Sequence, residues 1–143
     1  MSLTRVSEFR TFYSVQTSAD AVRLARGGEP WPTGLQKANI GPGFYAWENR
    51  ADAERYHARL TEHGVTDLQI VSYRIVNDDL VRLKTLDMRD LSDDTINDWM
   101  TKHSHYGGDS PVPHDYQHVI RNTGMRVSEH YFASEVFHLF REA

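Results

Sequence analysis

In the first third of the chain, the spacing of the hydrophobic residues predicts strands and helices in alternation. The aromatic and β-branched run Thr11–Val15 predicts a short strand. Apolar residues at helical spacing then predict a helix over Ala19–Arg26, which a Gly-Gly pair ends. After a turn-rich stretch from Glu29 to Gly43, the aromatic run Phe44–Trp47 predicts a second short strand.

A longer helix is predicted over Arg50–His63, with Asn49 as its N-cap. Ala53, Tyr56 and Leu60 fall on one face of this helix. We therefore expect this face to pack against the strand that precedes it.

Two apolar runs in the middle of the chain, Leu68–Val76 and Leu80–Leu86, predict a pair of strands. The turn residues at positions 77–79 join them, so we expect a hairpin. Ser92 then caps a further predicted helix. The core-facing positions of that helix recur at i, i+3, i+4 and i+7, and they are Ile96, Trp99, Met100 and His103.

Strands dominate the predicted end of the chain. A long loop between His103 and His114 leads to predicted strands over Tyr116–Arg121, Arg126–Ala133 and Glu135–Arg141. Helices in the first half and strands at the end are typical of an α+β fold rather than of regular βαβ alternation. We expect one domain over residues 1–143.

Composition narrows the class of protein. The chain has no cysteine, which excludes disulfides, Cys-ligated metal sites and a thiol nucleophile, and which fits a reducing compartment. No apolar stretch approaches the roughly 20 residues of a membrane span, and the N-terminus lacks the apolar segment of a signal peptide. We therefore expect a cytoplasmic protein with no membrane partner. A net charge of −4 disfavours bulk attraction to nucleic acid phosphates.

The most specific motif is the segment GPGFYAWE, residues 41–48. Ala53 and Tyr56 follow eight and eleven residues after Tyr45. This glycine pair and two-tyrosine spacing resembles the diphtheria-toxin and poly(ADP-ribose)-polymerase-like branch of the ADP-ribosyltransferase superfamily. The resemblance implies two small packed β-sheets around an NAD cleft with flanking helices. It also implies that Tyr45 and Tyr56 hold the nicotinamide ring, since aromatic faces suit a flat heteroaromatic cation.

A second part of the resemblance lies in the segment VSEHYF, residues 127–132. The family has its catalytic glutamate on a strand near this place, which makes Glu129 the implied catalytic residue. Its carboxylate would stabilise the oxocarbenium-like transition state as nicotinamide leaves. Glu135, six residues further on, is the alternative if the register is shifted.

The first strand departs from the family pattern. Ser14 stands where the family has a histidine that binds the adenine ribose, with Gln16 or Thr17 as substitutes. A hydroxyl can still hydrogen-bond a ribose. The residues that the resemblance places against NAD are Tyr13, Ser14, Gly41, Gly43, Tyr45 and Tyr56. Basic residues near the implied cleft would contact the diphosphate or lie on the solvated surface, and they are Arg10, Arg23, Arg26 and Lys37.

The implied reaction is cleavage of the nicotinamide–ribose bond of NAD as substrate, with transfer of ADP-ribose to a protein, a nucleic acid or water. The arginine-modifying branch has Glu or Gln two residues before its catalytic glutamate, whereas this chain has Val127. The acceptor is therefore undefined. The chain is most similar to small bacterial members, some of which are toxins, so an inhibitory partner protein is also expected.

Two alternatives remain open. The segment His103–His118 contains four histidines and Asp115 within sixteen residues, including His105 and His114, and these donor types suit zinc, nickel or iron. No known metal motif is present there, so a polar loop is the main hypothesis and a metal-dependent hydrolase the alternative. The missing first-strand histidine also fits an inactive ligand- or partner-binding module of the same fold.

Overall fold

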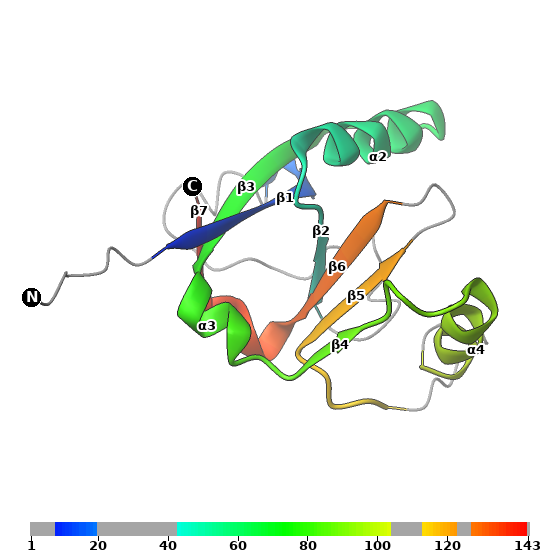
Figure 1. Cartoon of the computed structure of the whole chain (residues 1–143). Helices are drawn as coiled ribbons and strands as arrows, with labels where there is room; N and C mark the ends of the chain where they lie inside the picture. The colour runs from blue at the N-terminus through cyan, green and yellow to red at the C-terminus, as the bar shows by residue number, and fades with distance from the viewer. Residues whose placement is uncertain (1–7, 20–42, 104–112, 123–126, 143) are drawn as a thin grey trace, which may run out of the picture.

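Two small β-sheets and the helices beside them make up residues 8–19, 43–103, 113–122 and 127–142, the part of the chain that the computed structural model describes (Figure 1). The three-stranded sheet has the order β1 (Phe9–Thr17), β3 (Leu68–Val76) and β7 (Phe140–Glu142). The four-stranded sheet has the order β2 (Gly43–Ala46), β6 (Ser128–Ala133), β5 (His118–Asn122) and β4 (Thr85–Asp87). The expected α+β class with two small sheets is confirmed.

The three-stranded sheet is built on a long antiparallel pair. β1 and β3 align over nine residues each, from Phe9 opposite Val76 to Thr17 opposite Leu68. The alternation of buried and less buried residues along β3 is the one expected for a strand with one face in the core. β7 adds to the other edge of β3 in antiparallel orientation.

The four-stranded sheet joins segments that are distant in sequence. β6 lies between β2 and β5 and is antiparallel to both, while β4 is parallel to β5. An isolated bridge connects the two sheets, because the backbone groups of Tyr13 and Trp47 exchange two hydrogen bonds of 2.8 Å. The first strand is therefore held directly against the end of β2.

Aromatic residues fill the space between the sheets. Phe44 of β2 packs within 5.4 Å, ring centroid to ring centroid, of Tyr73, Phe132, Phe137 and Phe140. Phe12 of β1 makes an edge-on contact with Phe132, with ring centroids 4.9 Å apart. These geometries are the offset and T-shaped ones that aromatic rings favour.

Helices cover the outer faces of the two sheets. Helix α2 (Arg50–Glu62) packs Ala53, Tyr56 and Leu60 in one cluster with Val15 of β1, as the helical spacing predicts. Helix α4 (Asp93–His103) lies against the four-stranded sheet, and Ser92 caps it by accepting a 3.2 Å hydrogen bond from the Thr95 N–H.

The predicted hairpin over residues 68–86 is wrong. Residues 77–81 form a short helix, α3 (Asn77–Val81), and β4 joins the other sheet, parallel to β5. Asp78 and Asp79 lie in the first turn of α3, where carboxylates are favoured by the helix dipole, and Leu80 is buried in the aromatic core. The polar run therefore starts a helix that carries the chain from one sheet to the other.

The predicted strand Glu135–Arg141 is also mostly wrong. Residues 134–139 form a 3₁₀ helix, η2 (Ser134–Leu139), and only the end of the segment forms β7. Val136 and Phe137 are buried at adjacent positions, which a strand with one buried face does not allow.

Several expectations fall outside the described residues. These are most of the predicted helix Ala19–Arg26, the glycine at position 41 and the loop at 104–112. In the part of the chain that is described, no helix is long and apolar enough to cross a membrane.

Candidate functional site

Trp47 is the point at which the motif residues of three elements meet. Its backbone bridges to Tyr13 of β1, and its ring lies on that of Tyr56 from α2, with centroids 4.9 Å apart and planes at 38°. Only 4% of the Trp47 surface is exposed. Tyr13 and Tyr56, which are 43 residues apart in the chain, thus lie in one cluster.

Glu129 lies beside the same cluster. In the β2–β6 register Ala46, the residue before Trp47, is opposite His130, the residue after Glu129. Val127, two residues before Glu129, packs against the cluster that contains Trp47. We refer to Tyr13, Trp47, Tyr56 and Glu129 together as the Trp47 junction.

An arginine from the neighbouring strand holds the Glu129 carboxylate. Arg121 Nε donates a 3.0 Å hydrogen bond to Glu129 Oε1, and the two residues are paired across β5 and β6. Their side chains are 16% and 12% exposed, respectively. An ion pair that is largely shielded from water is fixed in orientation more firmly than one on an open surface. The carboxylate is therefore held in a fixed orientation by Arg121.

Tyr45 and Tyr56, which the family resemblance pairs around nicotinamide, belong to different hydrophobic clusters. Tyr45 is buried on the α4 side of the four-stranded sheet, with its ring centroid 5.6 Å from that of Tyr131. Tyr56 lies in the α2 cluster against Trp47. The aromatic neighbour of Tyr56 at the junction is thus Trp47.

Ser14, which takes the place of the family's histidine, is a buried link between strands. Its hydroxyl donates a 2.7 Å hydrogen bond to the Tyr45 carbonyl oxygen and accepts one of 2.9 Å from Gln16 Nε2. Both Ser14 and Gln16 are fully buried. The single hydroxyl proton of Ser14 is therefore already used inside the protein.

Gln16 ends this link with an unsatisfied group. Its Oε1 is buried and has no hydrogen-bond partner among the residues that the structure describes. A buried amide oxygen without a partner costs about 1–3 kcal/mol, so a donor from outside this set would be favoured there.

Gly43 is required by close packing of the strands. A Cβ at this position would overlap the Phe132 carbonyl oxygen and lie 2.5 Å from Tyr131 Cε1. The second glycine of the motif thus lets β2 approach β6.

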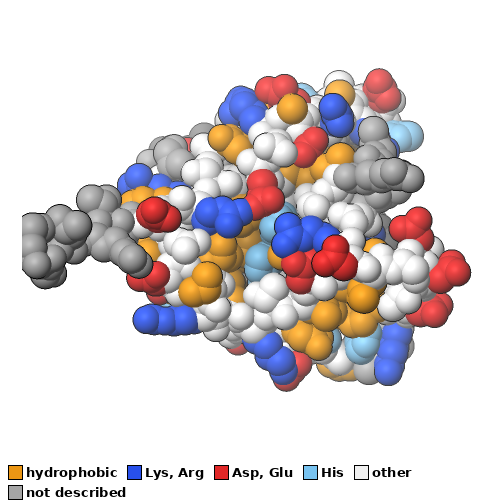
Figure 2. Space-filling model, viewed as in Figure 1, with side chains coloured by type: hydrophobic (Ala, Val, Ile, Leu, Met, Phe, Trp, Pro, Cys, Tyr) orange, Lys and Arg blue, Asp and Glu red, His pale blue; other side chains and the backbone are white. Residues whose placement is uncertain are grey.

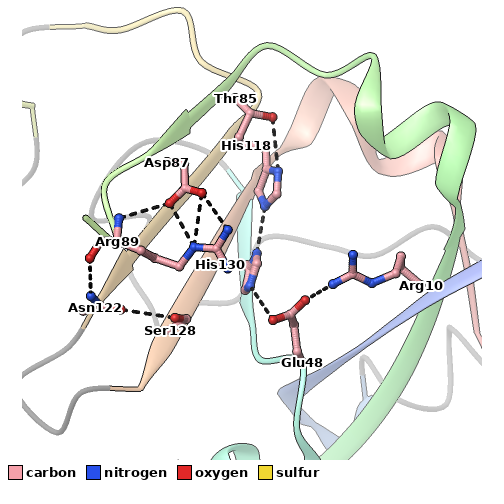
Figure 3. Close-up of polar contacts among 9 residues, drawn as sticks. All are labelled: Arg10, Glu48, Thr85, Asp87, Arg89, His118, Asn122, Ser128 and His130. Atoms are coloured by element: carbon pink, nitrogen blue, oxygen red, sulfur yellow. Dashed lines mark hydrogen bonds and ion pairs between the residues drawn. The ribbon is translucent and has the colours of Figure 1, made fainter. Parts of the chain in front are cut away.

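A buried polar network that the sequence analysis missed crosses the space between the sheets (Figure 3). His118 Nε2 and His130 Nδ1 are 2.8 Å apart, and Thr85 Oγ1 is 3.3 Å from His118 Nδ1. At the other end, His130 Nε2 lies 3.7 Å from Glu48 Oε2, and Glu48 forms an ion pair with Arg10. We call these five residues the inter-sheet network, and Figure 2 shows histidine in a hollow flanked by basic and acidic side chains on this face.

Both histidines of the inter-sheet network are neutral at pH 7. Burial lowers the pKa of His118 to about 4 and that of His130 to about 3. Two neutral imidazoles satisfy their short contact, since one ring donates and the other accepts. A general base works best with a pKa near the working pH, so these rings are suited to joining the neighbouring strands β5 and β6 rather than to proton transfer.

A charged pair lies at the rim of this network. Arg89 donates to Asp87 Oδ1 at 2.9 Å through Nε and to Oδ2 at 2.6 Å through Nη2. This hydrogen bonding lowers the pKa of the Asp87 carboxyl below its usual value. Asn122 Nδ2 donates a 2.8 Å hydrogen bond to the Arg89 carbonyl oxygen, which ties the pair to β5.

One sequence signal pointed to the network. His118 lies two residues before Ile120 on β5, and His130 lies two residues before Phe132 on β6. Side chains two residues apart share one face of a strand, so both histidines are on the inward face. Of the four basic residues considered for a diphosphate, Arg10 lies in the network, and the other three fall outside the described residues.

The histidine-rich segment is divided between different surroundings. His118 points into the inter-sheet network, while the His103 and His114 rings lie 6.2 Å apart beside Trp99. Asp115 is exposed and pairs with Lys84. Among the described residues no three histidine, aspartate or glutamate side chains are grouped to hold a metal ion, and His105 lies outside them.

Comparison with known proteins gave no relatives. No family model matches the chain, and neither does any curated protein or solved structure.

Proposed function

We propose that the chain is an ADP-ribosyltransferase-like protein that cleaves the nicotinamide–ribose bond of NAD. The observation that supports the proposal is the Trp47 junction. Tyr13 of β1 and Tyr56 of α2 meet at Trp47, and Glu129 lies on β6, the strand that pairs with β2 just before Trp47. Aromatic rings and a fixed carboxylate are groups that suit a ligand that is flat and positively charged.

In the proposed reaction the bond between the ribose C1′ and the pyridinium nitrogen breaks. The electron pair goes to the nitrogen, neutral nicotinamide leaves, and positive charge develops on the sugar. Glu129 stabilises this charge, and Arg121 orients the carboxylate through its 3.0 Å hydrogen bond. An acceptor group or water then bonds to C1′ and releases a proton.

Nicotinamide release from NAD by the purified protein tests the proposal. We expect the wild-type protein to release nicotinamide and Glu129→Gln to lose about 10²–10³-fold in rate, because the amide has no negative charge to stabilise the transition state. Glu142→Gln is the matched control, since Glu142 is exposed on β7 in the other sheet. It should retain the wild-type rate.

Thermal unfolding and circular dichroism show whether Glu129→Gln still folds. Because Arg121 can still donate to an amide oxygen, we expect the fold to be retained. Equal rates for Glu129→Gln and the wild type would exclude Glu129 as the stabilising carboxylate. Absence of both nicotinamide release and an NAD-dependent thermal shift would overturn the proposed function.

The surroundings of Ser14 favour a second candidate, an inactive binding module of the same fold. Its hydroxyl is buried and donates to the Tyr45 carbonyl, so it offers no proton to a ribose. Such a module would give no nicotinamide release with any acceptor. The same assay therefore separates the two candidates.

A further inference from the structure

A pocket of about 260 Å³ lies where β6 ends and η2 begins. Its walls include the rings of His114, Tyr116 and Tyr131, and Ser134 and Glu135 add polar groups. Sites for drug-sized ligands measure roughly 300–1,000 Å³. This pocket is therefore suited to one ring-sized or side-chain-sized group and is too small for a dinucleotide.

The aromatic walls are held in place by their neighbours. The His114 ring centroid is 5.9 Å from that of Tyr131 and 6.0 Å from that of Tyr116, and Trp99 lies 5.3 Å behind His114. The Tyr116 backbone N–H donates a 3.1 Å hydrogen bond to His114 Nδ1. This contact fixes the orientation of the His114 ring in the wall of the pocket.

The charge around the pocket favours a cation. Lys84 Nζ lies 5.3 Å from the centroid of the Tyr116 ring, so one face of this ring already contacts a cation, while the charge of Lys84 is balanced by Asp115. Glu135 is exposed and has no salt-bridge partner in the described part of the chain. Burial keeps the Tyr131 phenol neutral by raising its pKa. Glu135 therefore supplies the negative charge that a bound group would meet.

We propose that this pocket binds the guanidinium group of an arginine on a protein partner. A guanidinium is flat, stacks on aromatic faces and pairs with a carboxylate through two hydrogen bonds, whereas a lysine ammonium does not stack. Tyr131 lines the pocket and stands two residues from Glu129 on the same face of β6, about 7 Å along the strand. A partner held there would lie on the same face of β6 as Glu129.

The role of that partner as acceptor rests on the proposed function, but binding of the arginine does not. Val127 replaces the Glu or Gln of the arginine-modifying branch. The pocket arginine is thus the group by which the partner is recognised, rather than the group that is modified.

Titration of the full chain with N-acetyl-arginine amide, followed by NMR, tests the inference. N-acetyl-citrulline amide is the control ligand, because its side chain has nearly the same shape without the charge. We expect the arginine derivative to shift resonances of the pocket residues and to bind at least about tenfold more tightly than the citrulline derivative.

Two variants test the assigned walls. Glu135→Gln removes the charge and Tyr116→Leu removes a ring, and each should weaken binding of the arginine derivative by at least about fivefold. Glu142→Gln, an exposed glutamate in the other sheet, should bind as the wild type does. Absence of arginine binding, equal binding of the two ligands, or unchanged binding by Glu135→Gln would each overturn the inference.

Nicotinamide release is measured on the same preparation, so that the two proposals fail separately. Release without arginine binding would overturn only the pocket assignment. Arginine binding with neither nicotinamide release nor an NAD-dependent thermal shift would support the pocket assignment and overturn only the proposed reaction.

Discussion

At the scale of single residues, two glycines have different physical roles. Gly43 is a strand residue without room for a Cβ, because β6 passes too close. Gly64 has open space around it, but its φ of +84° lies in the left-handed region. At position 43, steric overlap with β6 therefore excludes any side chain. At position 64, a side chain has room, and the only restriction is the backbone φ angle.

This difference predicts two separate patterns of destabilisation. Gly43→Ala should lower the free energy of unfolding by about 1–3 kcal/mol, because the strands must separate to fit the methyl group. Gly64→Ala should lower it by about 1–2 kcal/mol, because alanine disfavours a positive φ. Chemical denaturation of the two variants measures both values.

Asparagine substitutions distinguish the two causes. Asn adopts positive φ more readily than Ala, so Gly64→Asn should be more stable than Gly64→Ala. At position 43 the larger side chain should make Gly43→Asn less stable than Gly43→Ala. The same order at both positions would contradict the assigned roles.

At the scale of elements, α4 illustrates a helix whose sequence pattern and packing agree. Ile96 and Met100 are buried against Tyr45 and Tyr131, and the remaining faces are exposed or half-buried. Periodicity was sufficient here because a helix brings residues three and four apart to one face whatever it packs against.

Truncation of the buried face of α4 should be costly. Met100→Ala removes a buried side chain from the cluster around Tyr45 and should lower the free energy of unfolding by about 2–5 kcal/mol. Asp98→Ala, at an exposed position of the same helix, should change it by less than about 0.5 kcal/mol. Similar midpoints for the two variants in denaturation experiments would mean that α4 is not docked on the sheet.

The segment between β3 and β4 shows where element-level prediction failed. Two apolar runs around three polar residues fit a hairpin and a helical crossover equally well. The crossover is favoured because Leu80 enters the core between the sheets and β4 finds a parallel partner in β5, 33 residues further on. Because β5 is so far along the chain, no local sequence pattern around β4 could reveal it as the partner strand.

At the scale of the whole molecule, the inter-sheet network makes stability depend on pH. His118 and His130 have pKa values of about 4 and 3 in the folded protein, against about 6.5 when unfolded. The groups that face them are Thr85, Asp87, Arg89, Glu48 and Arg10. At pH values between the folded and the unfolded pKa, these two histidines are protonated only in the unfolded chain. Lowering the pH therefore favours unfolding.

The predicted stability is therefore complete above about pH 6.5 and declines as the pH falls toward 4. Near pH 5, unfolding should take up about two protons through these two residues. Denaturation of the wild type at several pH values between 4.5 and 7.5 measures the slope.

A variant with both His118→Leu and His130→Leu provides the comparison. The two leucines have a similar volume and do not titrate. The slope of the variant's unfolding free energy against pH should therefore be smaller than that of the wild type near pH 5, by the equivalent of about two protons. An unchanged slope would show that the two rings are protonated equally in the folded and unfolded chain.

The sequence by itself determined the features that depend on local spacing. These are β1, β2, β3, α2, α4 and β6, the α+β class, and the positions of Tyr56 and Glu129 on a helix and a strand. Each follows from propensity and periodicity within a dozen residues, which the chain sets before any distant segment is in place.

Only the tertiary structure decided which of these positions meet. The contact of Tyr56 with Trp47, the pairing of Glu129 with Arg121 and the contact of His118 with His130 join different elements. Burial of Ser14 against the Tyr45 carbonyl, 31 residues away, likewise depends on strand register. These contacts form because strand pairing and the packing of sheets and helices fix side chains of distant segments relative to one another, and no short stretch of sequence encodes that arrangement.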